Sequence, residues 1–212
     1  MNKIRPAISC AKNGPYLLKS EAMSAVELCV PGPEGETVSS VSDVALCRCG
    51  GSSNKPFCDG THRKNSFNDR NESDTGENRV ASYSGTHLSI HDNRSICAHA
   101  GYCTDQLSAV FKMSSNPWID PDGASVEEII ALVNQCPSGA LSYTTNSETR
   151  EQTSESRIRV MKDGPYAISG VDLADHELGA GATSARFTLC RCGASKNKPF
   201  CDGSHWDIDF KG

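Results

Sequence analysis

Three cysteines and one histidine recur at the same spacing in two parts of the sequence. Both copies read C-x-C-x8-C-x3-H, with Asn-Lys-Pro-Phe before the third cysteine and Asp-Gly after it. Three thiolates and an imidazole make a complete four-ligand set for a metal centre. Because the identity extends to residues that bind no metal, the sequence predicts two copies of one cluster-binding unit. The candidate ligands are Cys47, Cys49, Cys58 and His62 in the first copy and Cys190, Cys192, Cys201 and His205 in the second.

The spacing divides each ligand set into two pairs. Cys47 and Cys49 are two residues apart, on one side of an extended chain, so both sulfurs can reach one metal ion. Residues 50–54 have turn composition and bring the chain back. Cys58 and His62 are four residues apart, which places them on one face of a helical turn. Two pairs favour a two-iron cluster in which each iron takes two protein ligands.

The motif resembles C-x-C-x8-C-D-G-[ST]-H, the signature of the CDGSH iron–sulfur proteins, which hold a 2Fe–2S cluster by three cysteines and one histidine. This resemblance implies that Cys47 and Cys49 bind one iron, that Cys58 and His62 bind the other, and that the second copy pairs its ligands likewise. Thr61 replaces the serine of the signature and keeps its hydroxyl. A structural zinc site is the alternative, since zinc also accepts this ligand set. Four-ligand zinc sites, however, usually use pairs of C-x2-C motifs and not C-x-C followed by a long loop. A disulfide is a weaker interpretation still.

A third group of cysteines lies between the two copies. Bacterial ferredoxins use C-x2-C-x2-C and a remote Cys-Pro. On that template Cys97 and Cys103 take the first and third positions, Cys136 precedes the proline, and Ala100 stands at the middle position. A four-iron cluster that lacks one protein ligand tends to lose the iron which that ligand would have bound, so we expect a 3Fe–4S cluster. The alternative is a 4Fe–4S cluster whose open corner is filled by His99 or an external group.

The whole middle segment resembles the divergent single-cluster ferredoxins, which share its W-I-D-P-D and C-P-S-G-A-L phrases. These phrases argue against three unrelated buried cysteines. Asp105 is near enough to be a remote fourth-ligand candidate, although nothing in the sequence singles it out.

Short strands are expected to position both motifs. Residues 12–18 are echoed by residues 162–168, with Gly-Pro-Tyr in each, so the repeat extends to a whole domain. Val26–Val30 alternates in hydrophobicity, as in a half-buried strand, and Val44–Leu46 leads into the first ligand. Asp59 and its counterpart Asp202 are expected to accept backbone N–H bonds at the start of the helical turn.

The middle segment has helical signals as well. A hairpin is predicted over residues 80–90. A helix is predicted after Cys103, with Leu107, Val110 and Phe111 on one face. A second helix is predicted to begin at Ser125, with Glu128 completing a capping box.

Two polar stretches, residues 67–78 and 144–156, separate three expected domains. These are a first CDGSH 2Fe–2S domain (1–66), a divergent ferredoxin-like domain (79–143) and a second CDGSH domain (157–212). The expected class is α+β, with two small β-rich cluster domains related by pseudo-twofold symmetry and a small ferredoxin-like α+β domain between them. Family members with one motif are commonly homodimers, so the resemblance implies that the two copies form such a dimer within a monomeric chain.

Composition restricts the setting. The chain has 212 residues, 37% apolar content and a mean hydropathy of −0.45, so core material is thin and metal clusters would act as staples. No run approaches the length of a membrane span, and the N-terminus has no apolar signal core.

Of the eleven cysteines, Cys10 and Cys29 alone fall outside the ligand sets. We expect these two to be plain thiols, and His87, His91 and His176 to be ordinary polar residues. A reducing, cytoplasmic setting follows, and the formal charge of −5 argues against a nucleic-acid surface.

The expected function is electron transfer by the clusters themselves. The sequence has no Ser-His-Asp set, nucleophile elbow, phosphate loop or G-x-G-x-x-G, so we expect no enzyme. A neutral histidine ligand makes a cluster easier to reduce and links its potential to pH. Lys55 and Lys198, beside the two loops, could tune the same properties. The partner is expected to be an unknown redox protein or cluster acceptor. There are two alternatives. The protein could be a cluster carrier or a redox and iron sensor, or its clusters could only stabilise the fold.

Overall fold

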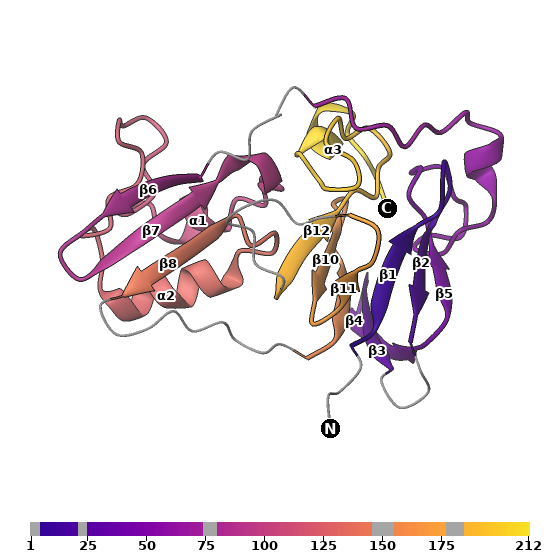
Figure 1. Cartoon of the computed structure of the whole chain (residues 1–212), viewed down its shortest axis with the longest axis horizontal. Coiled ribbons are helices and arrows are strands. Elements are labelled where there is room, and N and C mark those ends of the chain that lie inside the picture. The colour runs from indigo at the N-terminus through magenta and orange to yellow at the C-terminus, as the bar shows by residue number, and fades with distance from the viewer. Residues whose placement is uncertain (1–4, 21–24, 74–79, 146–154, 177–184) are drawn as a thin grey trace.

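In the computed structural model of the chain, two sheets with a common hydrophobic core carry both motif copies, and a third sheet belongs to the middle segment (Figure 1). The structure describes residues 5–20, 25–73, 80–145, 155–176 and 185–212. Residues 74–78 and 146–154 of the two expected polar connections, and the first four residues, lie outside the described part.

The first sheet has the strand order β11-β1-β2-β5. Three of its strands come from the first copy and one, β11, from the second. They are β1 (Ala7–Cys10), β2 (Tyr16–Lys19), β5 (Val44–Leu46) and β11 (Asp172–Leu173). Strand β11 lies parallel to β1, whereas the other neighbours are antiparallel.

The second sheet has the order β12-β10-β9-β3-β4. Its first three strands come from the second copy, and the β3–β4 hairpin comes from the first. The strands are β3 (Val26–Gly32), β4 (Gly35–Val41), β9 (Arg157–Val160), β10 (Tyr166–Ser169) and β12 (Arg186–Leu189). Strand β3 lies parallel to β9, where Leu28 pairs with Ile158.

The two copies therefore exchange strands. Each copy adds a strand beside the first strand of the other, in parallel orientation. The predicted strand at Val26–Val30 is confirmed, and its alternation buries Val26 and Leu28 completely. Those two side chains enter a core that also holds Ile8, Ile158 and Ile168, so apolar side chains of both copies leave water together.

The middle segment forms a separate small α+β unit. An antiparallel sheet in the order β6-β7-β8 packs with two helices around its own core. The elements are β6 (Val80–Ser84), β7 (Leu88–Asn93), η2 (Arg94–Ile96), α1 (Tyr102–Gln106), α2 (Val126–Gln135) and β8 (Leu141–Thr145). The predicted hairpin and the capping box at Ser125 are confirmed: Ser125 Oγ accepts from Glu128 N at 3.3 Å, and Glu128 Oε2 accepts from Ser125 N at 3.0 Å.

The predicted helix over Leu107–Phe111 is wrong. Helix α1 ends at Gln106, and the chain then turns. Val110 and Phe111 are buried nonetheless, because Phe111 forms a β-bridge with Ile119 and Asp120 N donates to Val110 O at 2.8 Å. Pairing with this later loop buries the same apolar side chains that a helix face would have buried.

The middle unit contacts the second copy at three places. Arg186 on β12 donates to the carbonyls of Val133 and Asn134 at the C-terminal end of α2, each at 2.9 Å. Asn197 Nδ2 donates to Ser95 O at 2.7 Å, and Trp206 Nε1 donates to His99 O at 3.3 Å. Figure 1 accordingly shows the middle unit beside β12 and α3 (Ser204–Asp207), with β1, β2 and β5 on the far side. Within the described residues, no helix has the length and apolar content needed to cross a membrane.

Candidate metal centres

The first copy brings its four predicted ligands into two pairs. Cys47 and Cys49 follow directly after β5, and their Sγ atoms are 3.9 Å apart. The 3-10 turn η1 (Thr61–Arg63) places His62 Nδ1 3.4 Å from Cys58 Sγ. Two sulfurs on one tetrahedral metal ion at about 2.3 Å each lie about 3.7 Å apart. The donor set and its spacing therefore fit a cluster in which each pair holds one metal ion.

The second copy repeats this arrangement. Cys190 and Cys192 follow β12 with their Sγ atoms 3.7 Å apart, and Cys201 Sγ lies 3.4 Å from His205 Nδ1 on α3. Its last pair is deeply buried, with Cys201 2% and His205 4% exposed. The assignment of these eight residues as ligands stays a prediction, and their convergence supports it.

The segment that carries each ligand set, residues 47–62 in the first copy and 190–205 in the second, is called its cluster loop. Side-chain hydrogen bonds join the two halves of each cluster loop. In the first copy, Asp59 Oδ2 accepts from Ser53 N at 2.8 Å and its Oδ1 accepts from Thr61 N at 3.0 Å. Asp202 makes the same pair of bonds with Lys196 N and Ser204 N. These bonds confirm the predicted acceptor role of both aspartates. A hydrogen bond with the Thr61 side chain, together with these backbone bonds, holds the pKa of Asp59 well below its usual range, so the acceptor stays charged.

Serine and lysine side chains complete the loop. Ser52 Oγ donates to Phe57 O at 2.7 Å, and Lys55 Nζ donates to Ser52 O at 2.9 Å. Ser195 and Lys198 do the same in the second copy, where Ser195 Oγ donates to Phe200 O at 2.7 Å. Each ammonium group is thus bound to its own loop. A tuning role for Lys55 and Lys198 stays a prediction.

The thiols in the second copy differ in proton affinity. The hydrogen bond with Cys192 and burial raise the pKa of Cys190, and the same hydrogen bond lowers the pKa of Cys192 to about 7. Burial raises the pKa of Cys201 to about 12. A buried thiol loses its proton when a metal cation takes the proton's place. Loading of this site therefore releases protons from groups that burial otherwise keeps neutral.

Two tyrosines cross between the copies. Tyr16 on β2 donates to Cys190 O at 2.8 Å and Pro199 O at 3.0 Å. Tyr166 on β10 donates to Cys47 O at 2.9 Å and Pro56 O at 3.0 Å. Both are fully buried, so each copy fixes the backbone of the cluster loop of the other copy. We did not predict this role, although Gly-Pro-Tyr in both copies was a visible signal.

The two cluster loops also touch each other directly. Gly50 has φ +73°, and a Cβ built there would lie 2.4 Å from Cys192 O. Gly193 has φ +82°, and its Cβ would lie 2.8 Å from Cys49 O. Glycine is needed at both positions, because the backbone of a ligand from the other copy fills the space of a side chain.

A buried arginine between the first two ligands was also missed. Arg191 donates to Gly164 O and Met161 O, each at 2.8 Å, and to Gly212 O at 3.0 Å. Its guanidinium also lies 4.9 Å from the centre of the Phe210 ring. Arg191 thus fixes the end of the chain against the loop before β10. The Cys-Arg-Cys triplet shared by both copies could have identified it.

The middle unit gathers its three predicted ligands around one cavity. Cys97, Cys103 and Cys136 line a cavity of about 200 Å³, and Ala100 lines it too. Burial raises the pKa of Cys97 and of Cys103. Three thiols and no fourth thiol around one cavity fit a cluster held at three corners.

Two residues near this cavity, His99 and Asp105, were the candidates for the fourth ligand of the cluster. His99 is exposed, and its ring lies against Gly203 of the second copy, where an added Cβ would be 2.9 Å from His99 Cδ2. The carboxylate of Asp105 lies against Gly101 and accepts from Thr104 Oγ1 at 3.3 Å. His99 also lines the cavity, whereas Asp105 does not, so His99 is the better placed of the two alternative ligands.

One further group of possible ligands was not predicted. The donor atoms of Cys10, Asp175 and His176 lie within 4.8 Å of one another, and Cys10 N donates to Asp175 Oδ2 at 2.8 Å. Burial raises the pKa of Cys10 to about 11, so its thiol is protonated at neutral pH. The pairing of β1 with β11 brings these residues together, and no sequence spacing could have indicated it.

The comparisons with known proteins agree with these three groups. A family model described as "Iron-binding zinc finger CDGSH type" matches residues 13–63 and 163–206. A model described as "Divergent 4Fe-4S mono-cluster" matches residues 83–146. These ranges overlap the three expected domains, and the description as iron-binding favours iron over zinc.

Two relatives match parts of the chain. "Uncharacterized protein YjdI" of Escherichia coli strain K12 is 36% identical over 61 residues, which are 29% of this chain and 80% of that protein. "CDGSH iron-sulfur domain-containing protein 2 homolog" of Drosophila ananassae is 28% identical over 104 residues, which are 48% of this chain and 69% of that protein. No solved structure matches.

Proposed function

Because this chain belongs to the CDGSH iron-binding family, with two such domains flanking a divergent mono-cluster 4Fe–4S domain, we propose that it is a multi-cluster electron-transfer protein. One observation carries the proposal: three groups of predicted metal ligands converge within one chain, two on the repeated loops and one around the cavity of the middle unit. Clusters of this kind, when bound, accept and donate single electrons.

The two motif copies would each hold one 2Fe–2S cluster. We assign one 2Fe–2S cluster to Cys47, Cys49, Cys58 and His62, and the other to Cys190, Cys192, Cys201 and His205. Backbone groups support the thiolates, since Gly60 N donates to Cys58 Sγ at 3.4 Å and Ala194 N donates to Cys192 Sγ at 3.5 Å. Such bonds stabilise the charged form of a sulfur ligand.

We propose a 3Fe–4S cluster for Cys97, Cys103 and Cys136. The cavity offers three thiols, and Ala100 occupies the middle position of the ferredoxin template. His99 also lines this cavity, and its ring lies against Gly203. The matching family is described as 4Fe–4S. A 4Fe–4S cluster whose fourth ligand is His99 or an external group is therefore the competing assignment.

We further propose that the two copies form an internal counterpart of a homodimer, related by a pseudo-twofold axis. Three reciprocal features support it: the exchange of β3 and β11, the crossed bonds of Tyr16 and Tyr166, and the contact between the loops at Gly50 and Gly193. On this proposal the chain needs no second copy of itself to complete either site.

A reductive titration tests the function. The anaerobically purified protein should lose visible absorbance on stepwise addition of dithionite and regain it on oxidation by air-free hexacyanoferrate(III), through one-electron steps. Clusters that stay inert at all accessible potentials would overturn the electron-transfer function and leave the cluster-carrier and structural-staple alternatives.

One observation favours a second function, transfer of a cluster to an acceptor protein. Cys58 and His62 are half-buried, whereas Cys201 and His205 are buried. An acceptor could therefore approach the histidine side of the first cluster but not that of the second. On this account the first copy donates its cluster faster than the second copy does.

The matched pair of variants His62→Cys and His205→Cys separates these possibilities. We expect cluster transfer to an apo-ferredoxin to be biphasic in the wild-type protein. His62→Cys should slow the fast phase several-fold, because a fourth thiolate replaces the accessible imidazole, and His205→Cys should leave that phase unchanged. Equal effects of the two variants on the fast phase would argue against a carrier role.

A further inference from the structure

The equivalent loops of the two copies have different surroundings. Gly60 and Gly203 occupy the same place in the motif and have nearly the same φ, +86° and +89°. No heavy atom lies within 4 Å of a Cβ built at Gly60, whereas a Cβ at Gly203 meets the His99 ring at 2.9 Å. The middle unit thus covers the second loop and leaves the first one open.

Two of the three residues that join the second copy to the middle unit have changed in the first copy, whereas Asn197 corresponds to an unchanged asparagine, Asn54. Arg186, Asn197 and Trp206 make the contacts with the middle unit. The positions equivalent to Arg186 and Trp206 are Asp43 and Arg63, and both are exposed. Within the described residues neither Asp43 nor Arg63 has a hydrogen bond or ion pair to the middle unit. The histidine side of the first copy therefore faces solvent.

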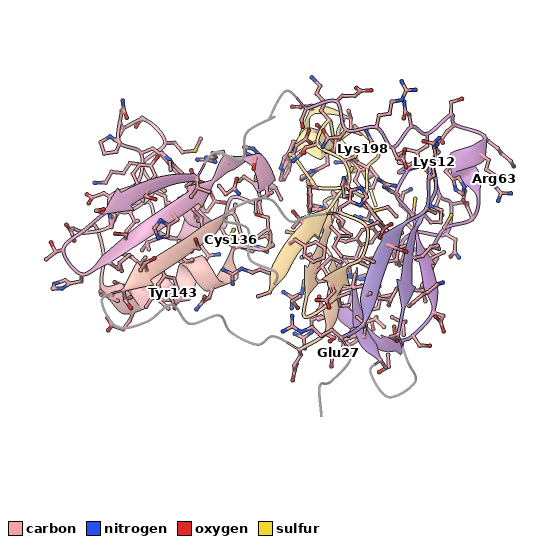
Figure 2. The ribbon with its side chains drawn as sticks, viewed as in Figure 1. Lys12, Glu27, Arg63, Cys136, Tyr143 and Lys198 are labelled. Atoms are coloured by element: carbon pink, nitrogen blue, oxygen red, sulfur yellow. The ribbon has the colours of Figure 1, made fainter. Side chains whose placement is uncertain are left out.

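An open hollow of about 690 Å³ lies on that side. It is lined by Cys58 and His62 and by the neighbouring Lys12, Pro15, Arg63 and Phe67. Figure 2 shows Lys12 and Arg63 on the side of the molecule that points away from the middle unit. A second protein at this hollow would contact two predicted cluster ligands.

Basic residues form the rim of the hollow: Lys12 and Arg63 line it, and Lys64 follows Arg63 in the chain. Lys12, Arg63 and Lys64 are exposed, and no ion pair holds any of them among the described residues. Of the nearby acids, Asp69 pairs with Arg48 at 3.4 Å, whereas Asp59 accepts two backbone N–H bonds and stays charged. Free cations at this place stand out in a chain with a formal charge of −5.

The second copy lacks this rim. There Lys162 has the place of Lys12, but tryptophan and aspartate, Trp206 and Asp207, replace the two remaining cations. Position 13, asparagine in the first copy, corresponds to Asp163. The basic charge therefore belongs to the open copy alone and is not required by the cluster loop itself.

We propose that the hollow beside His62, with Lys12, Arg63 and Lys64 at its rim, is the docking surface for a redox protein that presents carboxylates. This surface is called the His62 face below, and its role rests on the proposed electron-transfer function. Opposite charges steer the approach of such a partner, and the hollow brings it to the histidine side of the first cluster. The second copy makes its contacts within the chain and has no external partner.

Charged electron acceptors test the His62 face. The reduced protein gives one electron to hexacyanoferrate(III), which becomes hexacyanoferrate(II), or one electron to the cation hexaammineruthenium(III). At low ionic strength, the double variant Lys12→Glu/Arg63→Glu should react roughly tenfold more slowly with the anion and faster with the cation. Lys162→Glu, the equivalent change in the second copy, is the matched control and should resemble the wild-type protein.

A binding measurement separates this inference from the proposed function. Calorimetric titration of the oxidised protein with the redox-inert anion hexacyanocobaltate(III) should show one site that is lost in Lys12→Glu/Arg63→Glu and retained in Lys162→Glu. Absence of that site, or rates that the double variant and the control change equally, would overturn the docking surface. Failure of both acceptors to oxidise the wild-type protein would instead overturn the electron-transfer function, whatever the binding result.

Discussion

Alanine at Gly50 should lower the stability of the folded protein by about 2–5 kcal/mol. The left-handed conformation at φ +73° already disfavours a side chain. In addition, the new methyl group would lie 2.4 Å from Cys192 O, and a backbone carbonyl in the opposite cluster loop cannot move aside as a flexible side chain could. Both cluster sites should be disturbed, because the clash joins one loop to the other.

Gly60→Ala is the control for this prediction. Gly60 has φ +86°, similar to that of Gly50, and no heavy atom lies within 4 Å of the added Cβ. It should therefore show only the conformational cost, about 1–2 kcal/mol. In a chain of this length about 1 kcal/mol shifts the thermal midpoint by roughly 2–4 °C, so Gly50→Ala should melt clearly below Gly60→Ala. Similar midpoints by circular dichroism and by cluster absorbance would show that the loops do not pack as described.

Cysteine at Ala100 should convert the central cluster from 3Fe–4S to 4Fe–4S. Ala100 lines the same cavity as Cys97, Cys103 and Cys136, at the position where the ferredoxin template has its middle cysteine. A thiolate there would supply the missing corner ligand. Low-temperature EPR should lose the oxidised 3Fe–4S signal and gain a signal of a reduced 4Fe–4S cluster, with more iron bound per chain.

Ala98→Cys provides the matched control, because Ala98 lines the same cavity two residues earlier and is buried. Position 98 is not a cysteine position of the ferredoxin template, so a cysteine there should leave the 3Fe–4S signal in place. If the wild-type protein already shows a four-iron signal that Ala100→Cys does not change, the central assignment is wrong.

The sequence could predict whatever depends on local spacing. The motif C-x-C-x8-C-x3-H specified two pairs of ligands, and in both copies the structure places the paired donors within 4 Å. The capping box at Ser125 and the alternating strand at Val26 are local signals too, and both are confirmed. In these cases the interacting residues are close in the chain.

The sequence could not predict contacts between distant segments. The exchange of β3 and β11 depends on parallel pairing between strands from different copies, as at Leu28 and Ile158, and no local pattern encodes such a choice. The error at Leu107–Phe111 has the same origin, because pairing of Phe111 with Ile119 overrides a helical pattern. The grouping of Cys10 with Asp175 and His176 likewise exists only after folding.

The divergence of the two copies was visible in the sequence, but its meaning was not. Arg63 and Trp206 occupy equivalent positions, and their difference became interpretable only when Trp206 was found bonded to His99 O. The position of the middle unit on one copy turns two similar motifs into one covered site and one open site.

Low-temperature EPR, together with iron and acid-labile sulfide analysis of the anaerobically purified protein, tests the central claim most directly. We predict an oxidised 3Fe–4S signal before reduction and 2Fe–2S signals after it, with iron and sulfide in the amounts that two 2Fe–2S clusters and one 3Fe–4S cluster require. Protein that contains zinc without sulfide, or that shows no cluster signal in either state, would contradict the account.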